Sequence, residues 1–136
     1  MNKVEFSPAG GFQINRKLKE SLMQENSIEP ENITFNLLED IKFKFTKVLH
    51  KSQSIEYFKP ENVNKMKQSF VSFQSRKINI SYYTLVSSME TLFGNFEEEE
   101  PNIAYSFLRC LMSVDQLIVK KLSQNVVISG GVANHK

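Results

Sequence analysis

The side chains best suited to nucleophilic or metal chemistry are Cys110, His50 and His135. A reactive thiolate needs a histidine or a helix amino terminus beside it, and Cys110 falls in the middle of a predicted helix, far along the chain from His50. We therefore expect Cys110 to be a small, half-buried side chain without a chemical role. One cysteine and two histidines also make a poor set for structural zinc, which takes four ligands at short spacings. The sequence predicts no metal and no cofactor.

The remaining motifs also have simple interpretations. The glutamate run 97–100 lacks the alternating oxygen ligands and central glycine of a calcium loop, so we expect a solvated acidic turn. The pairs Gly10-Gly11 and Gly130-Gly131 lack the Lys-Ser/Thr that follows in a phosphate-binding loop. The neighbouring carboxylates Glu39 and Asp40 point about 100° apart on a helix and do not face each other. We predict no catalytic residues and a protein that is not an enzyme.

Length and composition are those of one ordinary globular domain. The chain has 136 residues, of which 40% are hydrophobic. We expect a single helical domain over 1–136, with an ordered core at about 12–123 and a flexible tail at 129–136. No apolar run approaches the ~18 residues of a membrane span, and the amino terminus lacks a secretory pattern. We therefore expect a cytoplasmic protein without a membrane partner, inside a host cell if a virus encodes it.

Apolar residues recur at helical spacing in five segments, which predicts the elements that must position any site. The first helix is expected over Phe12–Glu25. The second begins at Pro30 and carries His50 near its end. Its apolar stripe consists of Leu37, Leu38, Ile41, Phe45, Val48 and Leu49. Because Ile41–Phe45 also alternates between apolar and polar residues, a strand is the alternative there.

A polar linker over 52–59 leads to the third and fourth predicted helices. The third begins at Pro60 and carries a narrow apolar seam formed by Val63, Met66, Phe70 and Phe73. The fourth is capped by Asn79 or Ser81 and ends at Gly94, which we expect to adopt a left-handed conformation. The alternative is a strand over Ile78–Val86, because apolar residues alternate at its start.

The fifth predicted helix is the most hydrophobic one. It follows Pro101 and extends over Asn102–Leu122, with apolar residues around more than half of its circumference. Such a helix is usually central in a bundle. The segment Val126–Gly131 that follows is a candidate for a short strand. The predicted fold is therefore all-α, a compact bundle of about five helices with a possible short C-terminal strand.

Charged residues are segregated along the chain. Residues 1–41 carry a net charge of −3, residues 42–77 carry +7, and residues 78–115 carry −5. The simplest interpretation is neutralisation within the molecule, where exposed pairs contribute little. The others are a positive face for an acidic protein partner and a contact with a nucleic-acid backbone. Since Arg76 is the only arginine of the basic segment, a protein partner is favoured over nucleic acid.

Phe43 gives the protein-partner hypothesis a specific anchor. On the second predicted helix it lies opposite the apolar stripe, among Glu39, Lys47 and His50, as an interface aromatic with a polar rim does. The alternative is that a second neighbouring element covers it.

The leading hypothesis is a non-enzymatic protein-interaction module, of a regulatory, inhibitory, immunity-type or assembly kind, that binds its partner through the basic surface of the second and third helices. The candidate binding residues are Phe43, Lys42, Lys44, Lys47, Lys51, Lys65, Arg76 and Lys77. The alternative is a nucleic-acid-associated protein that uses the 42–77 segment. Self-association into a homo-oligomer such as a homodimer is a further hypothesis, because an aromatic-rich bundle can bury leftover apolar surface in a symmetric contact.

Overall fold

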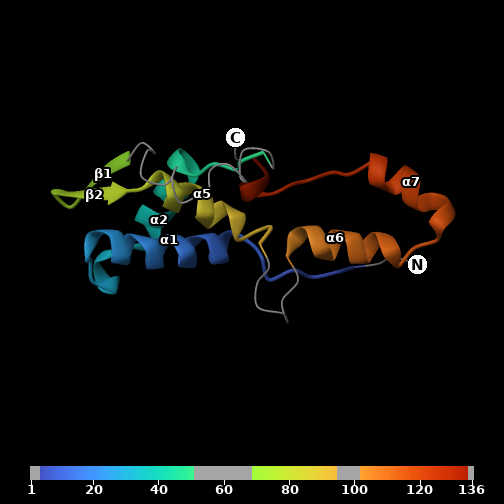
Figure 1. The fold of residues 1–136 in the computed structure, drawn as a ribbon, viewed down its shortest axis with the longest axis horizontal. Helices are drawn as coiled ribbons and strands as arrows, with labels where there is room; N and C mark the ends of the chain where they lie inside the picture. The colour runs from blue at the N-terminus through green and yellow to red at the C-terminus, as the bar shows by residue number, and fades with distance from the viewer. Residues whose placement is uncertain (1–3, 51–68, 95–101, 135–136) are drawn as a thin grey trace.

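The computed structural model describes residues 4–50, 69–94 and 102–134 (Figure 1). These residues form five α-helices, two short 3₁₀ helices and one antiparallel sheet of two strands. The fold is therefore mixed α+β, although mostly helical. The prediction of an all-α bundle is wrong because a segment expected to continue the third helix forms a β-hairpin instead.

Helix α1 (Gly11–Asn26) is the centre of the core. Its stripe of Ile14, Leu18 and Leu22 is fully buried, because a four-residue spacing keeps these side chains on one face. That face packs against α2, α5 and strand β2. The first predicted helix is confirmed.

Helix α2 (Phe35–Phe45) begins later than predicted. Pro30 opens the 3₁₀ helix η1 (Pro30–Asn32), and the Thr34 hydroxyl then caps α2 by accepting a hydrogen bond of 3.3 Å from the Leu37 N–H. Since α2 ends at Phe45, the residues that follow do not extend its stripe. The alternative of a strand over Ile41–Phe45 is wrong.

Strands β1 (Ser69–Phe73) and β2 (Arg76–Ile80) form a hairpin, with Phe73 paired to Arg76 across the turn. Residues 74 and 75 both have positive φ, 47° and 63°, which matches the tight turn that suits the twist of a hairpin. The third predicted helix is therefore wrong over 69–73. Its first part from Pro60 and the linker over 52–59 lie outside the described residues.

Helix α5 (Tyr82–Glu90) confirms the fourth predicted helix, with Ser81 as its cap. The Ser81 hydroxyl accepts a hydrogen bond of 3.1 Å from the Thr84 N–H. The alternative strand over Ile78–Val86 is correct only for Ile78–Ile80, which lie in β2, because the chain turns helical after that strand. Gly94 is not left-handed; the helix ends in a turn whose Gly94 N–H donates to the Glu90 carbonyl at 2.7 Å.

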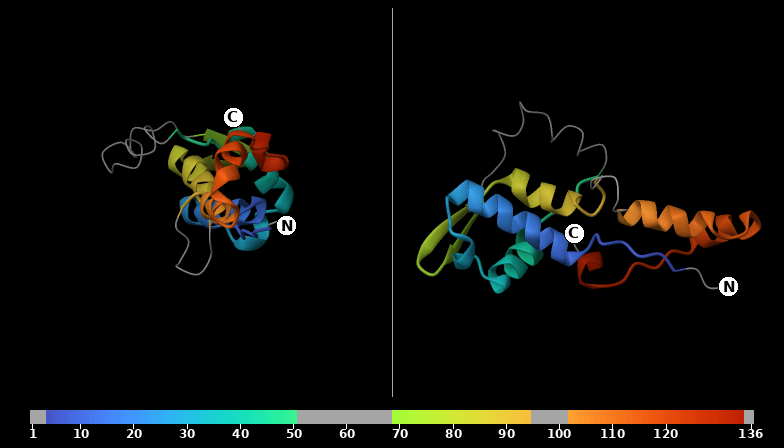
Figure 2. Two further views of the ribbon diagram at one scale, coloured as in Figure 1. Left: turned by 90° about the vertical axis from the view of Figure 1, so that its right-hand side faces the viewer. Right: turned by 90° about the horizontal axis from the view of Figure 1, so that it is seen from below.

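The fifth predicted helix is divided into α6 (Ile103–Met112) and α7 (Gln116–Gln124). The break falls at residues 113–115, where the Asp115 carboxylate accepts a hydrogen bond of 2.9 Å from the Leu117 N–H and so starts a new helix. Figures 1 and 2 show α6 and α7 projecting away from the rest of the molecule. Both a continuous helix and its central position in a bundle are wrong predictions.

After α7 the chain runs back toward the core (Figure 2). No residue of Val126–Gly131 is in a strand, and Val126–Ile128 are exposed, which corrects the prediction of a short C-terminal strand. The 3₁₀ helix η2 (Gly131–Asn134) follows, and Val132 within it packs against the buried core. Part of the expected tail thus lies on the core.

Candidate functional site

The projecting part of the molecule, residues 102–128, is the most unusual surface that the structure describes, and we call it the arm. It joins the core through Asn102, whose side-chain amide donates to the carbonyls of Phe93 and Gly94 at 3.0 and 3.2 Å. The same side chain caps α6 by accepting a hydrogen bond of 2.8 Å from the Tyr105 N–H. Asn102 therefore starts α6 and, together with the Ile103 N–H that donates to the Leu92 carbonyl at 3.1 Å, holds the start of α6 against residues 92–94.

The amino-terminal segment runs alongside α6 (Figure 2). The Ser106 hydroxyl donates a hydrogen bond of 3.4 Å to the Phe6 carbonyl, and Arg109 lies 3.9 Å from the Glu5 carboxylate. Ser106 is the one buried residue of α6. This side of the helix is therefore covered by the amino-terminal segment, while its apolar stripe faces elsewhere.

The arm exposes large apolar side chains. Met112 is 84% exposed and Leu117 is 85% exposed, values that no core position approaches. The other exposed members on α6 and α7 are Ile103, Tyr105, Phe107, Leu108, Ile118 and Leu122. Helix α6 packs chiefly on α7, so each helix has one main neighbour and an apolar face wider than that neighbour covers.

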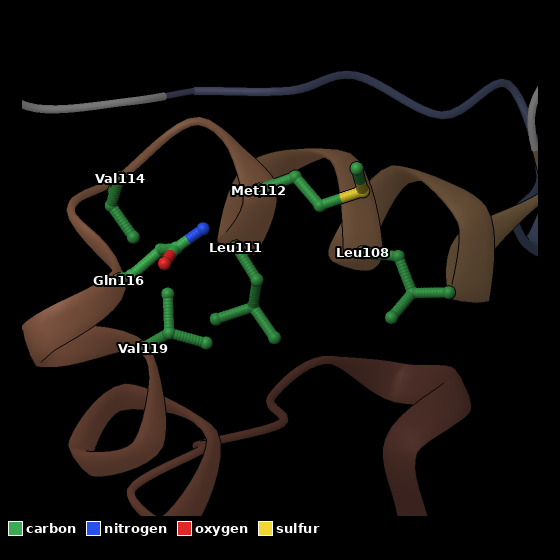
Figure 3. Close-up of a pocket in the computed structure, with 6 residues that line it drawn as sticks. All are labelled: Leu108, Leu111, Met112, Val114, Gln116 and Val119. Carbon is green, nitrogen blue, oxygen red and sulfur yellow. The ribbon is translucent and has the colours of Figure 1, made fainter.

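A hollow of about 380 Å³ lies between α6 and α7 (Figure 3). It is lined by Leu108, Leu111, Met112, Val114, Gln116 and Val119. Figure 3 shows the Leu108, Leu111 and Val119 side chains around it, with Gln116 as the polar group at its side. Its lining is suited to an apolar side chain and offers no acid or base.

Of the basic residues predicted to bind a partner, Lys42 is buried, with 5% of its side chain exposed. Its ammonium group forms an ion pair with Glu39, and the Asn15 amide donates a hydrogen bond of 2.6 Å to the same Glu39 oxygen. Burial acts to raise the pKa of Glu39, but the hydrogen bonds from Asn15 and Lys42 and the charge of Lys42 outweigh it and lower the pKa below 4.5. In this structure Lys42 is a structural cation rather than a surface contact.

The other predicted residues of this segment differ in their surroundings. Phe43 is 54% exposed, and the end of its ring would lie 3.7 Å from a Cβ placed on Gly131 of η2. Lys44 is exposed and pairs with Asp40 at 3.2 Å, and Lys47 is exposed beyond the end of α2. Lys51 and Lys65 lie outside the described residues.

Arg76 and Lys77 lie on the hairpin, not on a helix with the others. Both are exposed on β2, and the Lys77 ammonium group lies 3.7 Å from the centre of the Phe70 ring on β1. A cation over an aromatic face is attracted by its negative potential. The structure therefore does not gather the described members of the predicted basic surface on one pair of helices.

Cys110 is half-buried in α6, as predicted. Among the described residues no group of three or more His, Cys, Asp and Glu side chains could hold a metal ion. No helix in the described part of the chain has both the length and the apolar character required to cross a membrane.

Neither the models of known protein families nor the curated proteins give a match to this sequence.

The arm was not recognised from sequence, although a signal for it was present. The fifth predicted helix was apolar around more than half of its circumference, which was interpreted as burial in a bundle. The same pattern fits a helix whose faces are covered by another molecule. Periodicity reports that a face is apolar and does not report what covers it.

Proposed function

We propose that this chain is a non-enzymatic interaction protein that assembles with a second copy of itself by burying the apolar surface of the arm. The observation that carries this proposal is the exposure of the α6 and α7 side chains while a separate core is complete around α1. A monomeric protein rarely leaves a contiguous apolar patch larger than a few hundred Å² in water.

The total exposed apolar area of the arm is comparable with the area that a dimer interface buries. Side chains of the sizes found there present roughly 100–200 Å² each when fully exposed. At their exposed fractions, the apolar residues of α6, α7 and Val126–Ile128 offer on the order of 1,000 Å². A standard protein–protein interface buries about 800 Å² on each partner.

The composition of the arm favours an apolar interface rather than an electrostatic one. Its charged side chains are Arg109, Asp115, Lys120 and Lys121, and α6 carries only the first of these. The centres of protein interfaces are depleted of charge in the same way. Because Arg109 has the Glu5 carboxylate beside it, α6 itself would not bring an unpaired charge into such a contact.

A second copy fits the geometry of two helices that each have one main helical neighbour. Pairing two α6–α7 hairpins would give each helix further neighbours, as in a four-helix arrangement. A two-fold contact uses the same patch on both copies, so once the dimer has formed no copy of this patch remains exposed to bind a further molecule. In such a contact an apolar side chain of one copy can fill the hollow beside Leu111 of the other.

The experiment measures the mass of the full chain by light scattering after size exclusion, over a range of concentrations. We expect a dimer that becomes monomeric in Leu108→Glu and Met112→Glu, because each would bury a charge without a partner. Phe35→Glu is the matched control, since Phe35 is 66% exposed on α2, outside the arm, and its loss should leave the dimer intact.

Two results would contradict the proposal. A wild-type monomer at all concentrations up to about 100 µM would exclude an affinity useful for assembly. A dimer that survives both arm variants would place the contact elsewhere. Circular dichroism of each variant separates loss of the contact from loss of the fold.

A further inference from the structure

The hairpin lies at the end of the molecule away from the arm (Figure 1), and its two outer edges differ in what the described residues place against them. Phe73 pairs with Arg76 across a two-residue turn, and pairing continues to Ser69 with Ile80. In this register, alternate pairs exchange backbone hydrogen bonds, and the pairs between them point their N–H and C=O groups outward. Phe70 and Ser72 on β1, and Lys77 and Asn79 on β2, are the outward-pointing residues.

The outer edge of β2 is closed by the end of α1. The Asn26 amide donates to the Asn79 carbonyl at 2.8 Å, and the Asn79 N–H donates to the Asn26 side-chain oxygen at 2.7 Å. Next to them the Ser81 N–H donates to the Glu25 carboxylate at 2.9 Å. Asn26 therefore occupies the place of a neighbouring strand, and its position also shows that the Asn79 backbone faces away from β1.

The outer edge of β1 is open within the described part of the chain. No described residue forms a hydrogen bond with the outward N–H and C=O groups of Phe70 and Ser72. Proteins usually protect such an edge with a charge, a proline or a bulge on the edge strand. The β1 sequence, Ser-Phe-Val-Ser-Phe, has no charge and no proline, and its pairing runs without a bulge.

The hairpin itself is basic. Over residues 69–80 it carries Arg76 and Lys77 and no acidic residue. On the outer face of the hairpin, Ser72 is opposite Lys77, and Phe70 lies diagonally beneath the Lys77 ammonium group. Phe70 is 49% exposed, so this face offers an aromatic ring next to a positive charge.

We propose that the outer edge of β1 binds an extended acidic peptide as a third strand of the sheet. The backbone of the peptide pairs with Phe70 and Ser72, which gives affinity, and its alternate side chains face the outer surface, which gives specificity. The site prefers an acidic residue opposite Ser72, near Lys77, and an apolar residue two positions away over Phe70. This partner surface is separate from the arm, so it does not depend on self-association.

The probe is a fluorescent eight-residue peptide, Thr-Glu-Thr-Val-Thr-Glu-Thr-Val, titrated with the full chain and followed by anisotropy. Two control peptides keep the length: one replaces each Glu by Lys, and the other carries N-methyl groups on alternate backbone amides. We expect the glutamate peptide to bind, the lysine peptide to bind at least about tenfold more weakly, and the methylated peptide not to bind, since it cannot pair as a strand.

Two pairs of variants test the edge and the charge separately. Ser72→Pro removes an outward N–H and is tolerated on an edge strand, so it should weaken binding about tenfold or more, whereas Ser72→Ala keeps the N–H and should bind normally. Lys77→Glu should weaken binding of the glutamate peptide and improve that of the lysine peptide. Lys120→Glu, with the same change in net charge on α7, should do neither.

The proposal is overturned if the glutamate peptide fails to bind, or if Ser72→Pro binds it as well as Ser72→Ala does while both remain folded. A labelled single-stranded oligonucleotide is titrated in parallel. If it binds more tightly than the peptide, loses affinity steeply as salt rises and is unaffected by Ser72→Pro, the basic segment contacts nucleic acid instead. Loss of dimerisation in an arm variant leaves these outcomes unchanged, so the two proposals fail independently.

Discussion

At the scale of single residues, Lys42 shows that a lysine predicted to contact a partner can instead be buried in an ion pair. The sequence places it first among the lysines of the basic segment, with nothing to distinguish it from Lys44 or Lys47. In the fold it faces α1, where Glu39 and Asn15 form a polar cluster with it. The sequence could not show which lysine faces inward, because that depends on which face of α2 packs against α1.

The first prediction concerns this cluster. Glu39→Gln should lower the free energy of unfolding at pH 7 by about 2 kcal/mol, because it leaves the buried Lys42 ammonium group without its anion. Urea denaturation measures the change. Asp40→Gln is the matched control, since Asp40 pairs with Lys44 on the exposed side of α2, and it should have little effect. A wild-type stability for Glu39→Gln would mean that Lys42 reaches water.

The pH dependence of stability should also reflect the ionisation of Glu39 and of Glu90. The pKa of Glu39 is lowered in the folded state, so its contribution is present above pH 4.5 and is lost as the pH falls through the folded value. Burial raises the pKa of Glu90, so its carboxylate costs stability at neutral pH, and that cost disappears on acidification. We therefore expect the free energy of unfolding to fall less between pH 7 and pH 3 in Glu39→Gln than in wild type. In Glu90→Gln it should fall more than in wild type, because the compensating gain from Glu90 is absent.

At the scale of elements, the hairpin is the feature that could not be predicted from the sequence. Phe70 and Phe73 are three residues apart, which fits one face of a helix, yet in the strand they lie on opposite faces. The turn residues Gln74 and Ser75 both adopt positive φ although neither is the glycine, asparagine or aspartate that normally marks such a turn. A hairpin without its usual turn residues has no strong local signal.

A prediction at this scale distinguishes a hairpin from a helix by whether a glycine substitution stabilises or destabilises the fold. Ser75→Gly should raise the free energy of unfolding by about 1 kcal/mol, because glycine adopts positive φ without steric cost. In a helix the same change would lower it by a similar amount. Ser72→Gly, within β1, is the control and should destabilise in either case. Destabilisation by both glycines in thermal unfolding would contradict the hairpin.

The elements that could be predicted are those whose apolar spacing and capping residues lie within the element itself. The stripe of Ile14, Leu18 and Leu22 predicts α1 correctly, and Ser81 is one of the two residues, with Asn79, that the sequence offers as a cap of α5. The break between α6 and α7 was missed because apolar residues continue through it at helical spacing. Asp115 is a suitable helix cap, but one continuous helix over Asn102–Leu122 explains more apolar residues and was therefore favoured over a new start at Asp115.

At the scale of the whole molecule, the chain divides its apolar residues between two uses. Those of α1, α2, the hairpin and α5 form one buried core, and those of the arm remain largely in water. The sequence predicted apolar faces in both places. It could not distinguish them, because the hydrophobic effect depends on area removed from water and is the same whether the cover is intramolecular or a partner. The candidate surfaces were therefore the part of the molecule least accessible to sequence reasoning.

The last prediction uses hydrogen exchange to compare the two parts. Backbone amides of α1 should be strongly protected at any protein concentration, because they open only when the core does. Amides of α6 and α7 should be weakly protected in dilute protein and gain protection as concentration rises, since association stabilises the paired form by mass action. In Leu108→Glu this gain should disappear while the protection of α1 is unchanged. Arm amides as protected as those of α1 in the monomeric variant would mean that the arm needs no second copy to be stable.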